Sequence, residues 1–161
     1  NIRGMSIYTL SKNASSKEAA RLAKKENESE LIAGVPYDVK HSSDPIVKRM
    51  ILDFAKRGVK MAQEEQTKNS KKLAKYLDLH LRKVGNMLLN SRRSGGFAVL
   101  KSPDHPSVLL ELGFLSNRRD SKLLKNKSYL RRVADAIVDA VDDFCNRPSD
   151  PCTPKFKVKG D

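Results

Sequence analysis

Histidine, cysteine and aromatic residues are scarce in this sequence, and tryptophan is absent. The 161 residues include 3 His and 2 Cys, and 6% of them are aromatic. The cysteines and the scattered histidines His41, His80 and His105 lack the spacing of a zinc finger. Few aromatics, and no helix-turn-helix or RNP-type motif, argue against a nucleic-acid-binding protein, so we expect no nucleic acid partner.

Long apolar runs are missing as well. No stretch approaches the roughly eighteen consecutive apolar residues of a membrane span, and the first residues do not follow a signal-peptide pattern. We therefore expect no membrane span. Because the chain begins at Asn1 and enters a strand-like segment within a few residues, we expect a truncated or processed product whose upstream part holds an export signal and further chemistry.

Positive charge is abundant. The formal net charge is +13, and 32% of the residues are charged. The length and a hydrophobic fraction of 39% are those of one ordinary domain, which we expect to be monomeric. A surface this basic attracts polyanions such as nucleic acid, anionic lipid and bacterial cell-wall polymers.

The cysteines, Cys145 and Cys152, lie near Pro148, Pro151 and Pro154. A disulfide closing a short loop in an oxidising compartment and two free thiols are equally good interpretations. We expect 146–161 to be a basic tail rich in Pro and Lys, without a core of its own.

The first half of the chain predicts one strand and several helices. Met5–Leu10 alternates apolar and polar residues, as strands do. A capping box formed by Ser15 and Glu18 predicts a helix that runs to about Ile32. After a loop over 34–44, Asp44 and Pro45 predict the start of a second helix, which Gly58 bends or ends. A third helix is predicted from one apolar face: Leu73, Leu77, Leu81, Val84 and Leu88.

The second half predicts two buried strands and one secure helix. Short apolar runs at Phe97–Leu100 and Val108–Leu112 favour strands buried on both faces. The helix over Tyr129–Phe144 has an apolar stripe of Leu130, Val133, Ala134, Ile137, Val141 and Phe144. We expect an α/β fold with a mostly parallel, twisted sheet covered by helices in three layers, and with further strands upstream of Asn1.

Glu111 is the candidate catalytic residue. Its neighbours in Val108–Leu112 are apolar, so ionising it there costs several kcal/mol unless something compensates. Ligands of such sheets bind beyond the carboxyl ends of strands, where a desolvated Glu can act as a general acid or base. The alternatives are a Glu paired with a Lys or Arg, and a solvated strand end.

Two segments resemble a known enzyme family. The run from Gly96 to Pro103, followed by Pro106 to Asn117 with Glu111 in register, closely resembles the C-terminal signature of the zinc-dependent N-acetylmuramoyl-L-alanine amidases. The N-terminal run Arg3–Ser11 and the segments around Ala14–Ser16 and Glu26–Val35 resemble the Gram-negative periplasmic branch, which acts in daughter-cell separation. The similarity covers about 3–144.

The resemblance implies a peptidoglycan hydrolase that uses Zn²⁺. In this family the zinc ligands are a His in an Asp-Pro-Gly-His-Gly-Gly motif, a Glu, and a His in a His-Ala-Asp motif, all upstream of the part that matches Arg3 and Gly4. No metal ligand is expected in this chain, and Glu111 alone is carried over, as the group that takes a proton from zinc-bound water. The bond cleaved joins N-acetylmuramic acid to L-alanine of the stem peptide.

The same resemblance implies a regulatory insertion. We expect 1–145 to be the C-terminal part of the catalytic domain, with a helical insertion at about 15–68 that covers the active site until an activator protein displaces it. Glu18 is the candidate for an acidic ligand that occludes the zinc, although its capping-box role competes with this. The location implied is the periplasm.

Two rival interpretations remain. The first is an inactive amidase fragment that at most binds peptidoglycan. The second is a basic module that binds polyanions, either peptidoglycan or nucleic acid, and its motivation is the charge of +13.

Overall fold

The computed structural model describes residues 2–30, 45–102, 104–146 and 152, with the backbone alone for 28–30 and 45–60. The predicted loop over 34–44, the helix end at Ile32 and most of the basic tail therefore lie outside the described residues. No helix in the described part of the chain is both long enough and apolar enough to cross a membrane.

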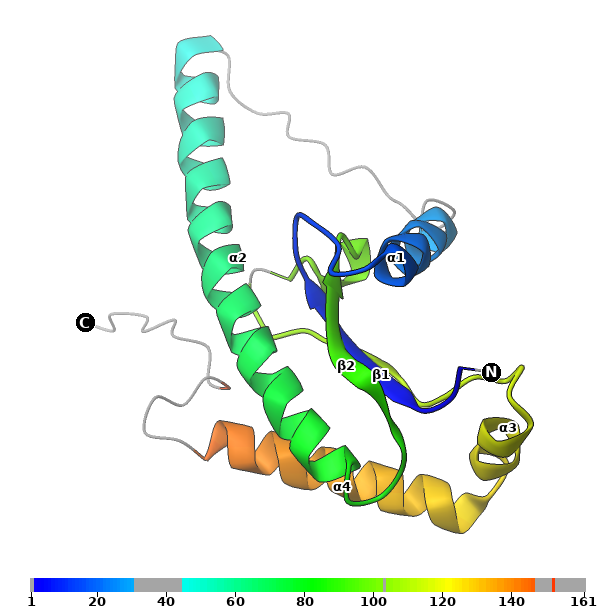
Figure 1. Cartoon of the computed structure of the whole chain (residues 1–161). Helices are drawn as coiled ribbons and strands as arrows, with labels where there is room; N and C mark the ends of the chain where they lie inside the picture. The colour runs from blue at the N-terminus through cyan, green and yellow to red at the C-terminus, as the bar shows by residue number, and fades with distance from the viewer. Residues whose placement is uncertain (1, 31–44, 103, 147–151, 153–161) are drawn as a thin grey trace.

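The described residues form a three-stranded sheet in the order β2-β1-β3. The strands are β1 (Met5–Leu10), β2 (Met87–Gly95) and β3 (Leu109–Glu111). The central strand β1 is parallel to β2 and antiparallel to β3, so the sheet is mixed. Together with the helices that cover it, this sheet confirms the α/β fold class (Figure 1).

Helices lie on both sides of the sheet and at one end of it. Their bounds are α1 (Lys17–Glu30), α2 (Pro45–Leu81), the 3₁₀ turn η1 (Ala98–Leu100), α3 (Arg118–Leu124) and α4 (Lys127–Cys145). Asparagine side chains begin the last two helices. Asn117 accepts hydrogen bonds from the backbone N–H groups of Arg119 and Asp120, and Asn126 accepts one from Tyr129.

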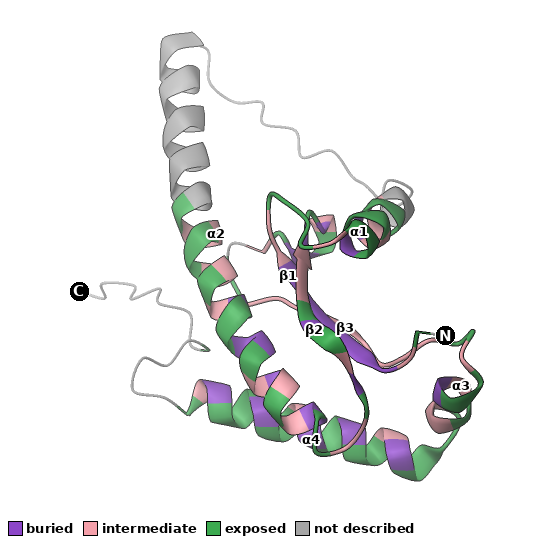
Figure 2. Cartoon of the chain, in the orientation of Figure 1, coloured by how far each residue is buried: buried purple, intermediate pink, exposed green. Residues whose placement is uncertain are grey.

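The alternation of β1 divides the core into two parts. Met5 and Ile7 point to one face, where α2 and α4 cover them, and Tyr8 points to the other face, under α1 and η1. Figures 1 and 2 show α1 on one side of the sheet and the crossed pair α2 and α4 on the other. The result is the predicted arrangement of three layers.

Polar and aromatic contacts fix α2 against α4. His80 Nε2 lies 2.7 Å from Asp143 Oδ2, and the rings of Tyr76 and Phe144 meet edge to face with centroids 6.4 Å apart. Cys145, the last residue of α4, forms a disulfide with Cys152. Of the two interpretations of the cysteines, the structure therefore has the disulfide.

The asparagine Asn27 fixes α1 above the sheet. Its side-chain amide donates a hydrogen bond of 2.8 Å to the carbonyl of Gly96, and its Oδ1 accepts one of 2.7 Å from the backbone N–H of Ala98. Both ends of the amide are used, so α1 is tied to the segment that leads into η1.

The structure corrects several predicted elements. The helix expected to include Leu88 ends at Leu81, and β2 follows it after a turn. The strand expected at Phe97–Leu100 is instead the turn η1, with Phe97 buried against Tyr8. The helix α2 passes through Gly58 and Lys68 without ending. All three residues of β3 are partly buried, whereas strands buried on both faces were expected.

The face of α4 that enters the core also differs from the predicted stripe. Ala134 and Val141 are exposed, while Tyr129, Ala136 and Ala140 are buried. The small side chains of Ala136 and Ala140 let α2 cross closely over α4. The predicted stripe included Ala134 and left out Ala136 and Ala140.

Candidate active site

Glu111 is the last residue of β3, as predicted, and it pairs with Ser6 of the central strand. Its Oε2 atom accepts hydrogen bonds from Ser6 Oγ at 3.3 Å and from Tyr8 Oη at 3.4 Å. Within the described part of the chain, no Lys, Arg or His nitrogen lies within 4.0 Å of its carboxylate. The described residues therefore give no support to the alternative in which Glu111 is paired with a Lys or Arg.

The two hydroxyl donors come from the buried side of β1. Ser6 and Tyr8 are 0% and 3% exposed. Burial, and the negative charge of Glu111 close by, raise the pKa of Tyr8 above its ordinary value. The phenol therefore keeps its proton and remains a donor to the carboxylate. Phe97 holds the ring in place edge to face, with centroids 5.3 Å apart.

A second buried carboxylate fixes the segment that follows Glu111. Asp120 accepts hydrogen bonds from the backbone N–H groups of Gly4, at 2.8 Å, and Phe114, at 3.1 Å. Gly113, which precedes Phe114, has φ +146°. A Cβ atom at this position would lie 3.1 Å from the Asp120 carboxylate. Asp120 thus joins the start of β1 to the end of β3 and limits how far Glu111 can move.

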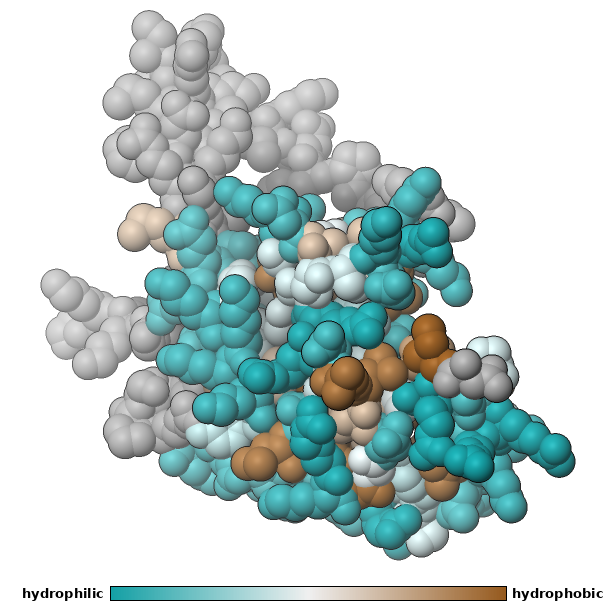
Figure 3. Space-filling view, in the orientation of Figure 1, coloured by the Kyte–Doolittle hydropathy of each residue, from teal (hydrophilic) through white to brown (hydrophobic). Residues whose placement is uncertain are grey.

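Glu111 lines an open cavity of about 760 Å³. Glu18 of α1 lines the same cavity, so the structure brings together the two residues that the sequence singled out. Cations surround them: Arg3, Arg21, Lys25 and Arg93. The remaining walls include the apolar side chains of Ile2, Leu22, Leu88, Leu89 and Phe114. Figure 3 shows apolar side chains gathered within an otherwise hydrophilic face.

The capping box predicted for Ser15 and Glu18 is wrong by one residue. Ser16 is the N-cap, and its Oγ accepts a hydrogen bond of 3.1 Å from the N–H of Ala19. The backbone N–H of Ser15 donates instead to the carbonyl of Ser94, at 2.8 Å. The Glu18 carboxylate thus does not cap the Ser15 N–H, but it still bonds within the first turn of α1, to its own backbone N–H and to the Ser16 hydroxyl.

Glu18 is an exposed carboxylate in a basic setting. Hydrogen bonds from its own backbone N–H and from the Ser16 hydroxyl lower its pKa, and the charges of Arg93 and Arg21 contribute in the same direction. It is thus ionised at neutral pH and accessible from the cavity.

The described residues do not provide a metal site. They contain no group of three or more His, Cys, Asp or Glu side chains that could hold a metal ion. His80 is paired with Asp143. His105 lies in an exposed turn, where its backbone N–H donates to Ser102 Oγ. The donor set of this part of the chain therefore does not fit a zinc ion by itself.

Sequence reasoning did not find Ser6, Tyr8 or Arg93. The period of two along β1 places Ser6 and Tyr8 on one face, which was a usable signal. The register of β1 against β3, which pairs Ser6 with Glu111 and Tyr8 with Leu109, had no local signal.

Comparisons with known proteins agree on one family. The Amidase_3 family, described as N-acetylmuramoyl-L-alanine amidase, matches residues 1–143. The chain is 32% identical over 145 residues to the N-acetylmuramoyl-L-alanine amidase AmiC of Neisseria meningitidis, and 34% over 142 residues to AmiC of Escherichia coli O6:H1. It is 30% identical over 142 residues to the amidase AmiA of E. coli K12.

These matches cover 88 to 89% of this chain but only part of each relative. The chain spans 32% and 31% of the lengths of the two AmiC proteins and 46% of AmiA. On the family match over nearly its whole length, this chain belongs to the Amidase_3 family of N-acetylmuramoyl-L-alanine amidases.

Proposed function

We propose that this chain is part of a peptidoglycan hydrolase that cleaves the amide between N-acetylmuramic acid and L-alanine of the stem peptide. The observation that carries the proposal is the Glu111 carboxylate, which ends β3, lines an open cavity and has no cationic partner among the described residues. The amidase names of the relatives support the same reaction.

In this proposal Glu111 is the general base. It accepts a proton from the water that attacks the lactyl carbonyl and returns it to the amino group of L-alanine as the amide breaks. Ser6 and Tyr8 hold the carboxylate through their hydroxyl groups, and Asp120 fixes the loop beside it. The site is therefore oriented before substrate arrives.

The family resemblance also implies Zn²⁺, which when bound supplies Lewis-acid chemistry. The described residues do not complete a site for it, so each step above is assigned to residues of this chain.

We further propose that α1 belongs to a regulatory insertion at about 15–68, and that Glu18 occludes the cavity until an activator protein displaces the helix. The shared cavity of Glu18 and Glu111 supports this. The disulfide between Cys145 and Cys152 supports an oxidising compartment such as the periplasm.

The test is release of stem peptides from purified peptidoglycan by the chain and its variants. Glu111→Gln keeps the size of the side chain and removes the base, so we expect the rate to fall about 10²- to 10⁴-fold. Glu18→Gln should raise the rate, and Asp139→Asn, on the exposed surface of α4 and outside the proposed insertion, should leave it unchanged. Equal rates for Glu111→Gln and the parent chain would refute the proposed base.

A second candidate function is peptidoglycan binding without hydrolysis. The net charge of +13 and the lack of a three-ligand metal group among the described residues favour it. Cosedimentation with sacculi without any release of peptide, together with a zinc content far below one ion per chain, would select this function over the first.

A further inference from the structure

A second cavity adjoins the one that contains Glu111. It measures about 650 Å³ and lies between the start of α1, the outer edge of β2 and the side of α2. The two cavities share four lining residues, Glu18, Leu89, Asn90 and Arg93. A ligand whose reacting group lies beside Glu111 can therefore extend into the second cavity.

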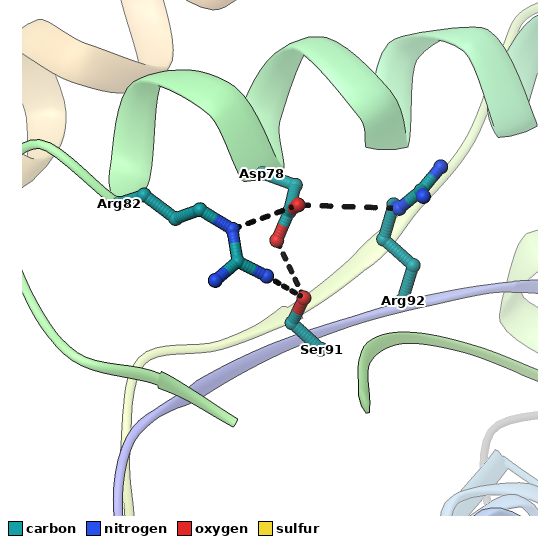
Figure 4. A network of polar contacts seen from close by, with 4 residues as sticks. All are labelled: Asp78, Arg82, Ser91 and Arg92. Carbon is teal, nitrogen blue, oxygen red and sulfur yellow. Dashed lines mark hydrogen bonds and ion pairs between the residues drawn. The ribbon is translucent and has the colours of Figure 1, made fainter. Parts of the chain in front are cut away.

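One carboxylate in this cavity lies between two guanidinium groups. Asp78 Oδ2 is 3.0 Å from Arg82 Nε and 4.0 Å from Arg92 Nε, and Asp78 Oδ1 accepts a hydrogen bond from Ser91 Oγ. Figure 4 shows Asp78 on α2, with Arg82 on one side and Arg92 on the other. The side chains of Arg82 and Arg92 are 50% and 53% exposed, while Asp78 is 15% exposed.

The cavity therefore has unneutralised positive charge. Its lining includes four cationic side chains, those of Lys71, Arg82, Arg92 and Arg93. The carboxylates are Glu18 and Asp78, which leaves two positive charges in excess. Asp78 uses only the Nε atoms of the two arginines in its ion pairs, and Arg82 Nη2 donates to Ser91 Oγ at 3.0 Å. The terminal nitrogens of Arg92 and the Nη1 of Arg82 therefore remain able to bind a further carboxylate.

The outer edge of β2 adds backbone groups to this cavity. Ser94 directs both its N–H and its carbonyl outward, where they bond to Ser15. By the alternation of a strand, the N–H and carbonyl of Arg92 face the same way. Ser15 occupies this edge at Ser94, but among the described strands none pairs with it at Arg92, so an extended peptide can add there as a short further strand.

We propose that this cavity is a carboxylate-binding subsite that takes the acidic peptide stem of the substrate, with Arg92 and Arg82 binding its carboxylates. The inference rests on the proposed function, because it extends the cavity of Glu111 along the substrate. Arg92 and Arg82 are specificity-determining residues in this scheme. They select an acidic, extended peptide over a neutral one.

The test compares two forms of one probe by isothermal calorimetry with the whole chain. The probe is the tripeptide L-alanyl-γ-D-glutamyl-diaminopimelic acid. The neutral control is the same tripeptide with its carboxylates converted to amides. We expect the acidic form to bind at least about tenfold more tightly, and the difference to shrink as salt is added. Equal affinity of the two forms, or no binding of either, would overturn the subsite.

Two variants with opposite expected effects on the affinity for the acidic peptide test whether the charge of the cavity, and not a loss of folding, determines the preference. Arg92→Gln should remove most of the preference for the acidic peptide, and Arg119→Gln, on the exposed surface of α3, should leave it unchanged. Asp78→Asn removes the competing anion and should tighten binding of the acidic form. If Asp78→Asn weakens binding as much as Arg92→Gln does, in protein that circular dichroism shows to be folded, the charge argument is wrong.

Glu111→Gln distinguishes this inference from the proposed function. It should lower peptide release about 10²- to 10⁴-fold while leaving the preference for the acidic tripeptide intact. A chain that hydrolyses peptidoglycan but shows no such preference refutes the subsite alone. A chain that keeps the preference in all forms but never releases peptide refutes the hydrolase alone.

Discussion

Tyr8 joins the core to the candidate site at the level of a single side chain. Its ring packs against Phe97 in the core, and its hydroxyl donates to Glu111. Burial and the nearby carboxylate raise its pKa, and burial together with the charge of Asp120 raises the pKa of Tyr129. Both phenols are therefore stabilised in their neutral form by the fold.

These shifts predict a loss of stability in alkali. A group with a raised folded-state pKa contributes stability that is fully present below its unfolded pKa, here about 10, and is lost as the pH rises through the folded value. We expect the free energy of unfolding, measured in urea, to fall above about pH 10. Tyr8→Phe and Tyr129→Phe should each flatten that decline, and an unchanged slope in both would contradict the shifts.

Among the site residues, the sequence singled out Glu111, whose catalytic role stays a prediction, and did not single out the residues that contact it. A carboxylate within an apolar run is visible in the sequence without any structure. Ser6 and Tyr8 look like ordinary strand residues until the antiparallel register places them opposite β3. Arg93 is one of 32 Lys and Arg residues, and only the cavity distinguishes it.

At the level of elements, the turn between α2 and β2 was the hardest to predict. The apolar spacing of Leu77, Leu81, Val84 and Leu88 continues past the end of the helix, whereas β2 is rich in Ser, Arg and Asn and lacks a strict alternation. The strand β1, the helix α4 and the end of β3 were predicted because their burial patterns are local. Phe97–Leu100 was misassigned because an apolar run of this length suits a strand or a buried turn equally.

Substitution of Gly85, in that turn, tests how closely α2, β2 and α4 approach one another. A Cβ atom there would lie 2.6 Å from Tyr129 Oη and 2.9 Å from Met5 Cε. We expect Gly85→Ala to lower the free energy of unfolding by about 1 to 3 kcal/mol through overpacking. Gly96→Ala is the matched control, since the nearest atom to its Cβ is Ser11 O at 3.9 Å. Similar urea midpoints for the two variants would show that the turn has room to adjust.

For the whole molecule, the disulfide ties Cys152 to the end of α4, where Cys145 is partly buried at the edge of the core. Cys145 and Cys152 are seven positions apart, while the adjacent Phe144 is buried between α2 and α4. The contacts that hold the layers together therefore do not depend on the cross-link.

Reduction should accordingly leave the chain folded. We expect non-reducing mass spectrometry to show a chain lighter by two hydrogens than the sequence mass. Cys152→Ser should cost at most about 2.5 kcal/mol, the chain-entropy value for so short a loop. Loss of the circular dichroism signal on adding reductant at room temperature would mean that the disulfide supports the core after all.

Because β1 is the central strand, its register determines both the packing of the core and the surroundings of Glu111. A slip of one residue would turn Ile7 toward Glu111 and push Tyr8 among the side chains of α2 and α4. Such a slip would disrupt both the packing of the core and the hydrogen bonds that hold Glu111. Under the proposed function, a misassembled chain would thus be unable to cleave peptidoglycan.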